Sequence, residues 1–177
     1  MHPKHYFNHC PKCGNSSTKY HTDEGYIRCE SCGFQLFINA AAAVAAIILD
    51  SYDRILFSYR AHPPAAGTLD LPGGFVDIGE SAEGALHREI KEELNLELDS
   101  IAYFTSQPNQ YTYNSVTYYT LDLTYICRAN SFENIRADDD ISEYTFYHPD
   151  KVPIEKIGLE SIKNIVQQYQ QFIKHNR

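Results

Sequence analysis

The stretch from Leu71 to Leu96, LPGGFVDIGESAEGALHREIKEELNL, constrains the fold of this chain more than any other. The glycine pair near its start permits a tight turn, and the residues from Ser81 onward read as a helix. Ser81 is a good N-cap, because its hydroxyl can accept a hydrogen bond from an unpaired amide of the first turn. Asn95 tolerates the left-handed conformation that closes a helix. The sequence therefore predicts a glycine turn followed by a capped helix.

This predicted helix carries an acidic stripe beside an apolar one. Successive residues of a helix are rotated by about 100°. The acidic side chains Glu89, Glu92 and Glu93 therefore fall within one arc of about 100° around the helix axis. The neighbouring apolar arc, which can dock on a sheet, holds Leu86, Ile90 and Leu94. Like charges at this spacing repel one another, so we expect compensating cations, and carboxylate oxygens favour Mg²⁺ or Mn²⁺. The alternative interpretation is a solvated acidic helix face that follows a glycine-rich turn.

The order of these residues resembles the Nudix box. Gly74 is followed after five residues by Glu80, and after seven more by Arg88-Glu89-Ile90-Lys91-Glu92-Glu93-Leu94-Asn95-Leu96. The one departure is Asn95, which stands where the box has glycine but tolerates the same backbone geometry. Because many positions are fixed over this stretch, the resemblance is specific.

The resemblance implies an α/β fold, a Nudix-type α/β/α sandwich around a mixed β-sheet. The implied reaction is Mg²⁺-dependent (or Mn²⁺-dependent) hydrolysis of a pyrophosphate in a nucleoside diphosphate linked to another moiety. Arg88 would orient Glu89, and Glu80 would support the loop or a further ion. The implied magnesium ligands are Glu89, Glu92 and Glu93, with the Gly74 carbonyl nearby. The alternative is a catalytically weak Nudix-fold module that binds or senses a nucleotide.

Two CxxCG motifs precede this region. A CxxC turn points two thiolates at one centre, and a pair of such turns forms a tetrahedral site suited to Zn²⁺. The four cysteines are Cys10, Cys13, Cys29 and Cys32. The segment resembles a zinc ribbon, with a redox dithiol or unpaired thiols as the alternative. Since four protein ligands leave no open position, the zinc would be structural. We expect a zinc ribbon over residues 1–38 and a Nudix domain over residues 39–177.

Substrate and general base stay open at this stage. A zinc ribbon before a Nudix domain is similar to the arrangement in NADH pyrophosphatases, and Ser106-Gln107-Pro108 matches the first half of a motif of those enzymes. ADP-ribose is the rival substrate. The residues that could stack on a base are Tyr111, Tyr113 and Tyr118, and Glu143 is a further candidate for substrate contact. The general base would be a box glutamate or a later acid, of which the candidates are Asp138, Asp139, Asp140 and Glu143.

Composition limits the partners that we expect. The 177 residues suit one globular domain with a small extra module, and 43% of them are hydrophobic. The formal net charge of −8 argues against general nucleic-acid binding, although metal ions can still attract phosphorylated small molecules. No signal peptide is visible, and the apolar run from Ala40 to Leu49 is too short to span a bilayer, so we expect a cytoplasmic protein. A homodimer is compatible with the sequence.

Hydrophobic patterns predict the remaining elements. Short strands are expected over 19–22 and 26–28, followed by a linker over 37–39. The other predicted strands are 40–49, 54–60, 99–106, 116–127 and 144–147, with 108–113 as a loop or hairpin arm. In the strand 116–127 we expect one face to hold Tyr119, Leu121, Leu123, Tyr125 and Cys127. An amphipathic helix is expected over 154–175, with Phe172 on its inner side.

Overall fold

The computed structural model describes residues 5–176, and the chain divides into two compact units. The first unit comprises the chain up to Ala40 together with Gln110–Tyr119. The second comprises Ala41–Asn109 and the chain from Thr120 onward. Each unit is described by itself below.

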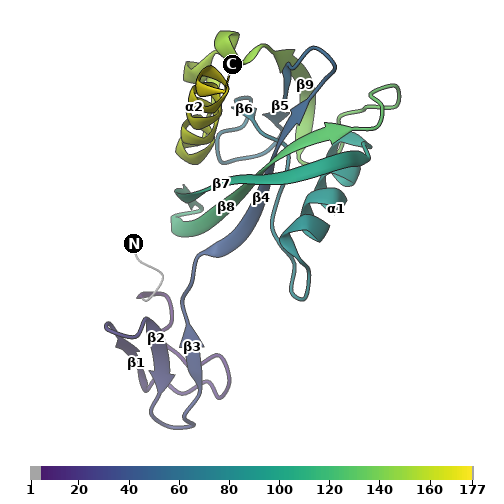
Figure 1. The fold of residues 1–177 in the computed structure, drawn as a ribbon. Helices are drawn as coiled ribbons and strands as arrows, with labels where there is room; N and C mark the ends of the chain where they lie inside the picture. Colours follow the sequence, from purple (N-terminus) through teal and green to yellow (C-terminus); the bar gives the residue numbers. More distant parts are fainter. Residues whose placement is uncertain (1–4, 177) are drawn as a thin grey trace. The chain divides into compact units, whose positions relative to one another are not determined.

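The first unit contains a three-stranded antiparallel sheet, seen in Figure 1. Its strands are β1 (Thr18–His21), β2 (Tyr26–Cys29) and β3 (Gln35–Phe37). The sequence predicted the first two strands, whereas the third begins before the segment expected as a linker. Ile27 and Cys29 of β2 are buried and Arg28 between them is exposed, as strand alternation requires.

The second unit is built on a mixed sheet of order β6-β5-β4-β8-β7, with β9 paired to β5. β4 and β8 run parallel, whereas β5 is antiparallel to β4, β6 and β9. The strands are β4 (Ala41–Leu49), β5 (Ile55–Arg60), β6 (Leu69–Asp70), β7 (Leu98–Tyr113), β8 (Val116–Ala129) and β9 (Ile141–Tyr147), the tips of β7 and β8 belonging to the first unit.

Two helices cover opposite faces of this sheet (Figure 1). α1 (Ala82–Leu94) packs on one face through Leu86, Ile90 and Leu94, and α2 (Glu160–His175) packs on the other through Ile162, Ile165 and Val166. The predicted α/β/α sandwich with a mixed sheet is therefore confirmed. Among the described residues, no helix is both long and apolar enough to cross a membrane.

Several predicted details of this unit were wrong. α2 begins at Glu160, because Ile154–Lys156 forms a 3-10 turn and Ile157 bridges to Leu69 of β6. Phe172 is 47% exposed, although it was expected on the inner side. Of the two alternatives for residues 108–113, the hairpin arm is correct, since they continue β7, which pairs with β8. One residue of the face of β8 that was expected to be apolar and buried, Leu121, is exposed. The residues Thr120, Asp122 and Thr124, on the opposite face, are buried.

Candidate active site

The helix α1 is capped at both ends by the residues that the sequence predicted. Ser81 is extended, and its hydroxyl accepts a hydrogen bond from the Gly84 amide at 3.0 Å. Asn95 is left-handed, with φ 53° and ψ 33°, and its amide donates to carbonyls of the last turn. These caps fix the start and end of the helix that carries the box carboxylates.

The glycine turn is tied to β4 by backbone hydrogen bonds. Val44 donates to the Gly74 carbonyl at 2.8 Å, and Ala46 donates to the Pro72 carbonyl at 2.9 Å. Val76 then donates to the Ala42 carbonyl at 3.0 Å. The segment before α1 therefore lies antiparallel to β4, with an isolated bridge between Ala43 and Phe75.

The two glycines allow a close approach that no other residue would permit. Gly73 has φ +139°, and a Cβ there would collide with the Val44 carbonyl. A Cβ on Gly74 would lie 2.5 Å from the Glu89 carboxylate. The Gly73 amide donates to Oε2 of Glu93 at 2.9 Å. The turn thus brings backbone atoms directly beneath two carboxylates of α1.

Arg88 connects the loop and three box glutamates. Its Nε and Nη2 donate to the two oxygens of Glu80 at 3.0 and 2.9 Å. Its Nη1 donates to Glu89 at 2.8 Å and to Glu92 at 3.2 Å, and Nη2 also donates to the Phe75 carbonyl at 2.9 Å. Glu80 in turn accepts from the Asp77 amide at 3.2 Å. Charge-assisted bonds of this kind hold the carboxylates in one arrangement.

Two of the box carboxylates, Glu89 and Glu93, have raised pKa values. Glu93 is 4% exposed, and burial together with the charges of Glu89, Asp70 and Asp140 raises its pKa to about 8. Burial also raises the pKa of Glu89, where Arg88 acts in the opposite direction and Glu92 and Asp139 add to the shift. A positive charge at this place would relieve both shifts, so the donor set suits a divalent cation.

The acidic loop before β9 lies against the C-terminal end of α1. Arg136 donates to the Leu94 carbonyl at 3.2 Å, and Asp138 donates to the Glu93 carbonyl at 2.9 Å. Asp139 and Asp140 act on the pKa values of Glu89 and Glu93, so the structure brings these candidate bases close to the box.

The remaining candidates are Glu143 and the tyrosines of the β7–β8 hairpin. Glu143 is exposed on β9, where it pairs with Tyr59 of β5. Tyr111 and Tyr113 belong to the first unit, in which Tyr111 stacks on Tyr118 with 5.5 Å between the ring centroids.

One buried charge pair was missed by the sequence analysis. Asp70, at the end of β6, is 6% exposed and accepts from Nη1 of Arg60 at 2.6 Å. Its other oxygen accepts from the Leu71 amide at 2.9 Å, just before the glycine turn. The available signal was a single acid between Leu69 and Leu71, in an otherwise apolar approach to the box.

The four N-terminal cysteines form a compact cluster in the first unit. Sγ of Cys10 lies 3.7 Å from Sγ of Cys32, and Sγ of Cys13 lies 3.7 Å from Sγ of Cys29. A tetrahedron with Zn–S bonds of about 2.3 Å has edges of about 3.8 Å, so the donors fit zinc. Within residues 5–176, this is the one group of three or more His, Cys, Asp or Glu side chains whose ligand atoms lie within 4.8 Å of one another. The box carboxylates are spread more widely.

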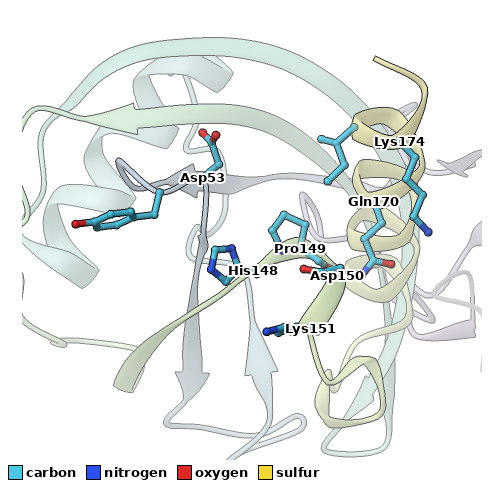
Figure 2. A pocket seen from close by; sticks show the side chains of 9 residues that line it. Asp53, His148, Pro149, Asp150, Lys151, Gln170 and Lys174 are labelled. Carbon is cyan, nitrogen blue, oxygen red and sulfur yellow. Dashed lines mark hydrogen bonds between the residues drawn. The ribbon is translucent and has the colours of Figure 1, made fainter. Parts of the chain in front are cut away.

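A separate pocket of about 520 Å³ lies between the β4–β5 turn, the segment after β9 and α2. Figure 2 shows Asp53, His148, Lys151 and Lys174 around it. None of its lining residues belongs to the box, so this pocket is distinct from the carboxylate site.

Comparison with known proteins identifies the family that the box residues resemble. The family model described as NUDIX domain matches residues 39–169. A relative named ADP-ribose pyrophosphatase, from Methanocaldococcus jannaschii, is 33% identical over 122 residues, which cover 68% of this chain and 69% of that protein. A relative named NAD-capped RNA hydrolase NudC, from Haemophilus influenzae, is 31% identical over 100 residues. That match covers 56% of this chain but only 38% of the relative.

A solved structure reproduces the fold. The crystal structure of a NUDIX hydrolase from Nitrosomonas europaea superposes with a TM-score of 0.72 at 18% identity, covering 96% of this chain and 93% of that one. The family model spans most of the chain, and the box residues form the glycine turn and the helix α1. The protein therefore belongs to the Nudix family of hydrolases.

Proposed function

We propose that this protein hydrolyses the pyrophosphate linkage of a nucleoside diphosphate joined to another moiety, with Mg²⁺ or Mn²⁺ as cofactor. The observation that carries the proposal is the convergence of Glu89 and Glu93 on the Gly73–Gly74 turn. When bound, a divalent cation neutralises phosphate charge and lowers the pKa of a bound water. The ligand set that we propose is Glu89, Glu92 and Glu93, with the carbonyl of Gly74.

The contacts support distinct roles for these groups. Arg88 holds Glu89 and Glu92 in place, and Glu80 holds Arg88 and the Asp77 amide. Of the two roles expected for Glu80, these contacts favour loop support. The Gly74 carbonyl accepts from Val44 but retains a second lone pair that could face a cation.

For the general base, the geometry favours the acidic loop over β9. Asp139 and Asp140 act electrostatically on Glu89 and Glu93, whereas Glu143 acts on Tyr59. We therefore propose that a loop acid or a box glutamate takes the proton from the attacking water.

ADP-ribose is the substrate that we favour, with NADH as the rival. The Methanocaldococcus relative bears the name ADP-ribose pyrophosphatase, and its match extends over two thirds of both chains. The residues that resembled the NADH pyrophosphatase motif, Ser106 to Pro108, lie within β7. Tyr111, Tyr113 and Glu143 stay candidates for substrate contact.

We also propose a structural zinc on Cys10, Cys13, Cys29 and Cys32, and a division of the chain into a ribbon over 1–38 and a Nudix domain over 39–177. The cytoplasmic location and a homodimer stay predictions.

The test is a Mg²⁺-dependent assay on ADP-ribose, NADH, nucleotide sugars and nucleoside triphosphates. We expect ADP-ribose to be cleaved into two monophosphates, with triphosphates turned over more slowly. Tight binding of ADP-ribose without turnover at any Mg²⁺ or Mn²⁺ concentration would instead support the nucleotide-sensing alternative. Size-exclusion chromatography of the same sample reports the oligomeric state.

A further inference from the structure

An ion pair lies at the end of β6, just before the glycine turn. Asp70 is 6% exposed, and one of its oxygens accepts a hydrogen bond from Nη1 of Arg60 at 2.6 Å. Taking two charges out of water costs free energy that their attraction often fails to recover, so an apolar pair of similar size is commonly as stable. Stability alone therefore gives no reason for an ion pair here, and its place beside the box points to a role in the site.

Asp70 begins a series of contacts that ends at a box carboxylate. Its second oxygen accepts a hydrogen bond from the Leu71 amide at 2.9 Å. The Pro72 carbonyl accepts a hydrogen bond from β4 at 2.9 Å, and the Gly73 amide donates to Glu93 at 2.9 Å. Since these residues are consecutive, Asp70 fixes the backbone that directs the Gly73 amide at Glu93.

Arg60 extends these contacts to two neighbouring loops. Its Nε donates to the Pro64 carbonyl at 2.7 Å, in the loop between β5 and β6. The next residue, Ala61, donates to the Asp140 carbonyl at 2.9 Å. The end of β5 therefore holds both Asp70 and the acidic loop that carries the candidate bases.

The charge of Asp70 also acts on the box. Burial is the main cause of the raised pKa of Glu93, and the charges of Glu89 and Asp70 add to it. Burial raises the pKa of Asp70 as well, and Arg60 acts in the opposite direction because it stabilises the ionised carboxylate. A negative charge that reaches Glu93 also attracts a cation bound there, since charges in a buried place are screened little.

We propose that Asp70 is a positioning residue for the catalytic cation. It holds the glycine turn against Glu93 and places a further negative charge behind the cation ligands, while Arg60 holds the Asp70 carboxylate in place. This inference rests on the proposed function, since it takes the acidic stripe of α1 as the cation site. A purely structural ion pair could be exchanged for a neutral pair without loss of cation affinity, whereas a positioning charge could not.

The experiment is to measure Mn²⁺ binding to the zinc-loaded full chain from the electron paramagnetic resonance signal of free Mn²⁺, with urea denaturation of the same proteins. Arg60→Gln together with Asp70→Asn gives a neutral pair that keeps an acceptor for the Leu71 amide. We expect this double variant to keep a urea midpoint close to that of the wild type, while the Kd for Mn²⁺ rises about ten-fold or more. The Mg²⁺ concentration for half-maximal hydrolysis should rise by the same factor.

Asp50 provides a matched control. It is also 6% exposed, accepts hydrogen bonds from the amides of Tyr52 and Arg54, and is bonded to Nε of Arg54 at 2.7 Å. It lies six residues after Val44, and therefore about 20 Å along β4 from the strand position that contacts the glycine turn. Arg54→Gln together with Asp50→Asn should leave the Mn²⁺ affinity unchanged.

Wild-type Mn²⁺ affinity in the folded Asp70 double variant, or equal losses of affinity in the Asp70 and Asp50 double variants, would overturn the proposal. If a double variant does not fold, the single variants Asp70→Asn and Asp50→Asn are compared in the same way, with Mn²⁺ bound per folded chain as the readout. Mn²⁺ binding requires no substrate. A wild type that binds Mn²⁺ with the predicted dependence on Asp70 but cleaves no nucleotide would therefore overturn the proposed function and support this inference.

Discussion

Glu93 and Arg88 are the residues on which the electrostatics of the box depend. Glu93 is nearly enclosed, next to three other acids, whereas Arg88 is bound to three glutamates at once. A buried carboxylate that is not neutralised destabilises the fold, and a guanidinium shared among acids partly offsets their repulsion.

The raised pKa of Glu93 predicts a pH-dependent loss of stability in the metal-free protein. Its folded pKa of about 8 exceeds the ordinary value of 4.5, so the folded state holds a proton that the unfolded state has lost between these two pH values. The stabilisation is complete below pH 4.5 and disappears as the pH rises to about 8. Relative to Glu93→Gln, the wild type should lose a free energy of unfolding on the order of a few kcal/mol across this window. Urea titrations measure it, and a pH-independent difference between the two proteins would contradict the assignment.

Arg88→Lys should reduce activity without unfolding the protein. Lysine keeps the charge but cannot make the paired bonds to Glu80 while also reaching Glu89 and Glu92. Loss of an orienting partner of metal-binding residues typically costs 10-fold to 100-fold, so we expect a drop of about that size in kcat at saturating Mg²⁺. Lys91→Arg, an exposed charge-conserving change three residues further along α1, is the control. Equal rates in wild type and Arg88→Lys would show that the network plays no part in activity.

At this scale the box was predictable because its residues lie within 23 positions of one another. Asp70 was not, since its burial depends on Arg60, ten residues earlier, and on a β5–β6 pairing that no local pattern reveals. Asp122 was missed as well: it is 6% exposed, on the face of β8 opposite the one expected to be apolar.

At the scale of elements, α1 follows local sequence rules and α2 does not. Ser81 and Asn95 bound α1 as predicted, because capping involves neighbours in the chain. α2 starts later than predicted, because Ile157 bridges to β6 and Gly158 leaves no room for a side chain against Thr68. These contacts are tertiary, and the hydrophobic pattern of 154–175 contains no sign of them.

Removing the cap of α1 should destabilise the second unit. Ser81→Ala leaves the Gly84 amide without its acceptor, which should cost about 1 kcal/mol in the free energy of unfolding. Chemical denaturation measures the change, and Ser51→Ala, in the exposed turn between β4 and β5, should change it by less than about 0.5 kcal/mol. Equal effects of the two substitutions would mean that the cap does not stabilise α1.

At the scale of the whole molecule, two units of different construction share one chain. The second unit has two buried clusters on either side of its sheet, whereas the first buries few apolar residues, among them Ile27. So small a core rarely folds without a metal or a covalent link. The contribution of Gln110–Tyr119 to this unit could not be predicted, because those residues lie about seventy positions beyond the ribbon.

The zinc proposal predicts one zinc per chain after purification without chelators. Cys13→Ser should lose the metal and the folded signals of the β1–β2–β3 sheet in a proton–nitrogen NMR spectrum, while the signals of α1 stay. Cys127→Ala, the fifth cysteine, is buried in β8 outside the cluster and should retain zinc. A metal-free wild type that keeps an ordered ribbon would contradict the structural role.

We propose that the acidic stripe of α1 binds the catalytic cation. The most direct test is to measure the rate of hydrolysis of ADP-ribose, or of the best substrate found, against Mg²⁺ concentration. Glu92→Gln and Glu93→Gln keep the size and helix propensity of the side chain but weaken a hard-cation ligand. Each should lower the rate about 100-fold or more at a Mg²⁺ concentration that saturates the wild type.

Thermal melts of the metal-free proteins complete this measurement. Both variants should melt no lower than the wild type, because they remove repulsion between neighbouring carboxylates. Glu97→Gln, a glutamate whose side chain is 72% exposed just after α1, should keep the wild-type rate. If the acidic stripe of α1 binds the cation, the rate collapses in the two box variants while the fold stays intact; wild-type rates in both at the same Mg²⁺ concentration would show that the stripe is not the metal site.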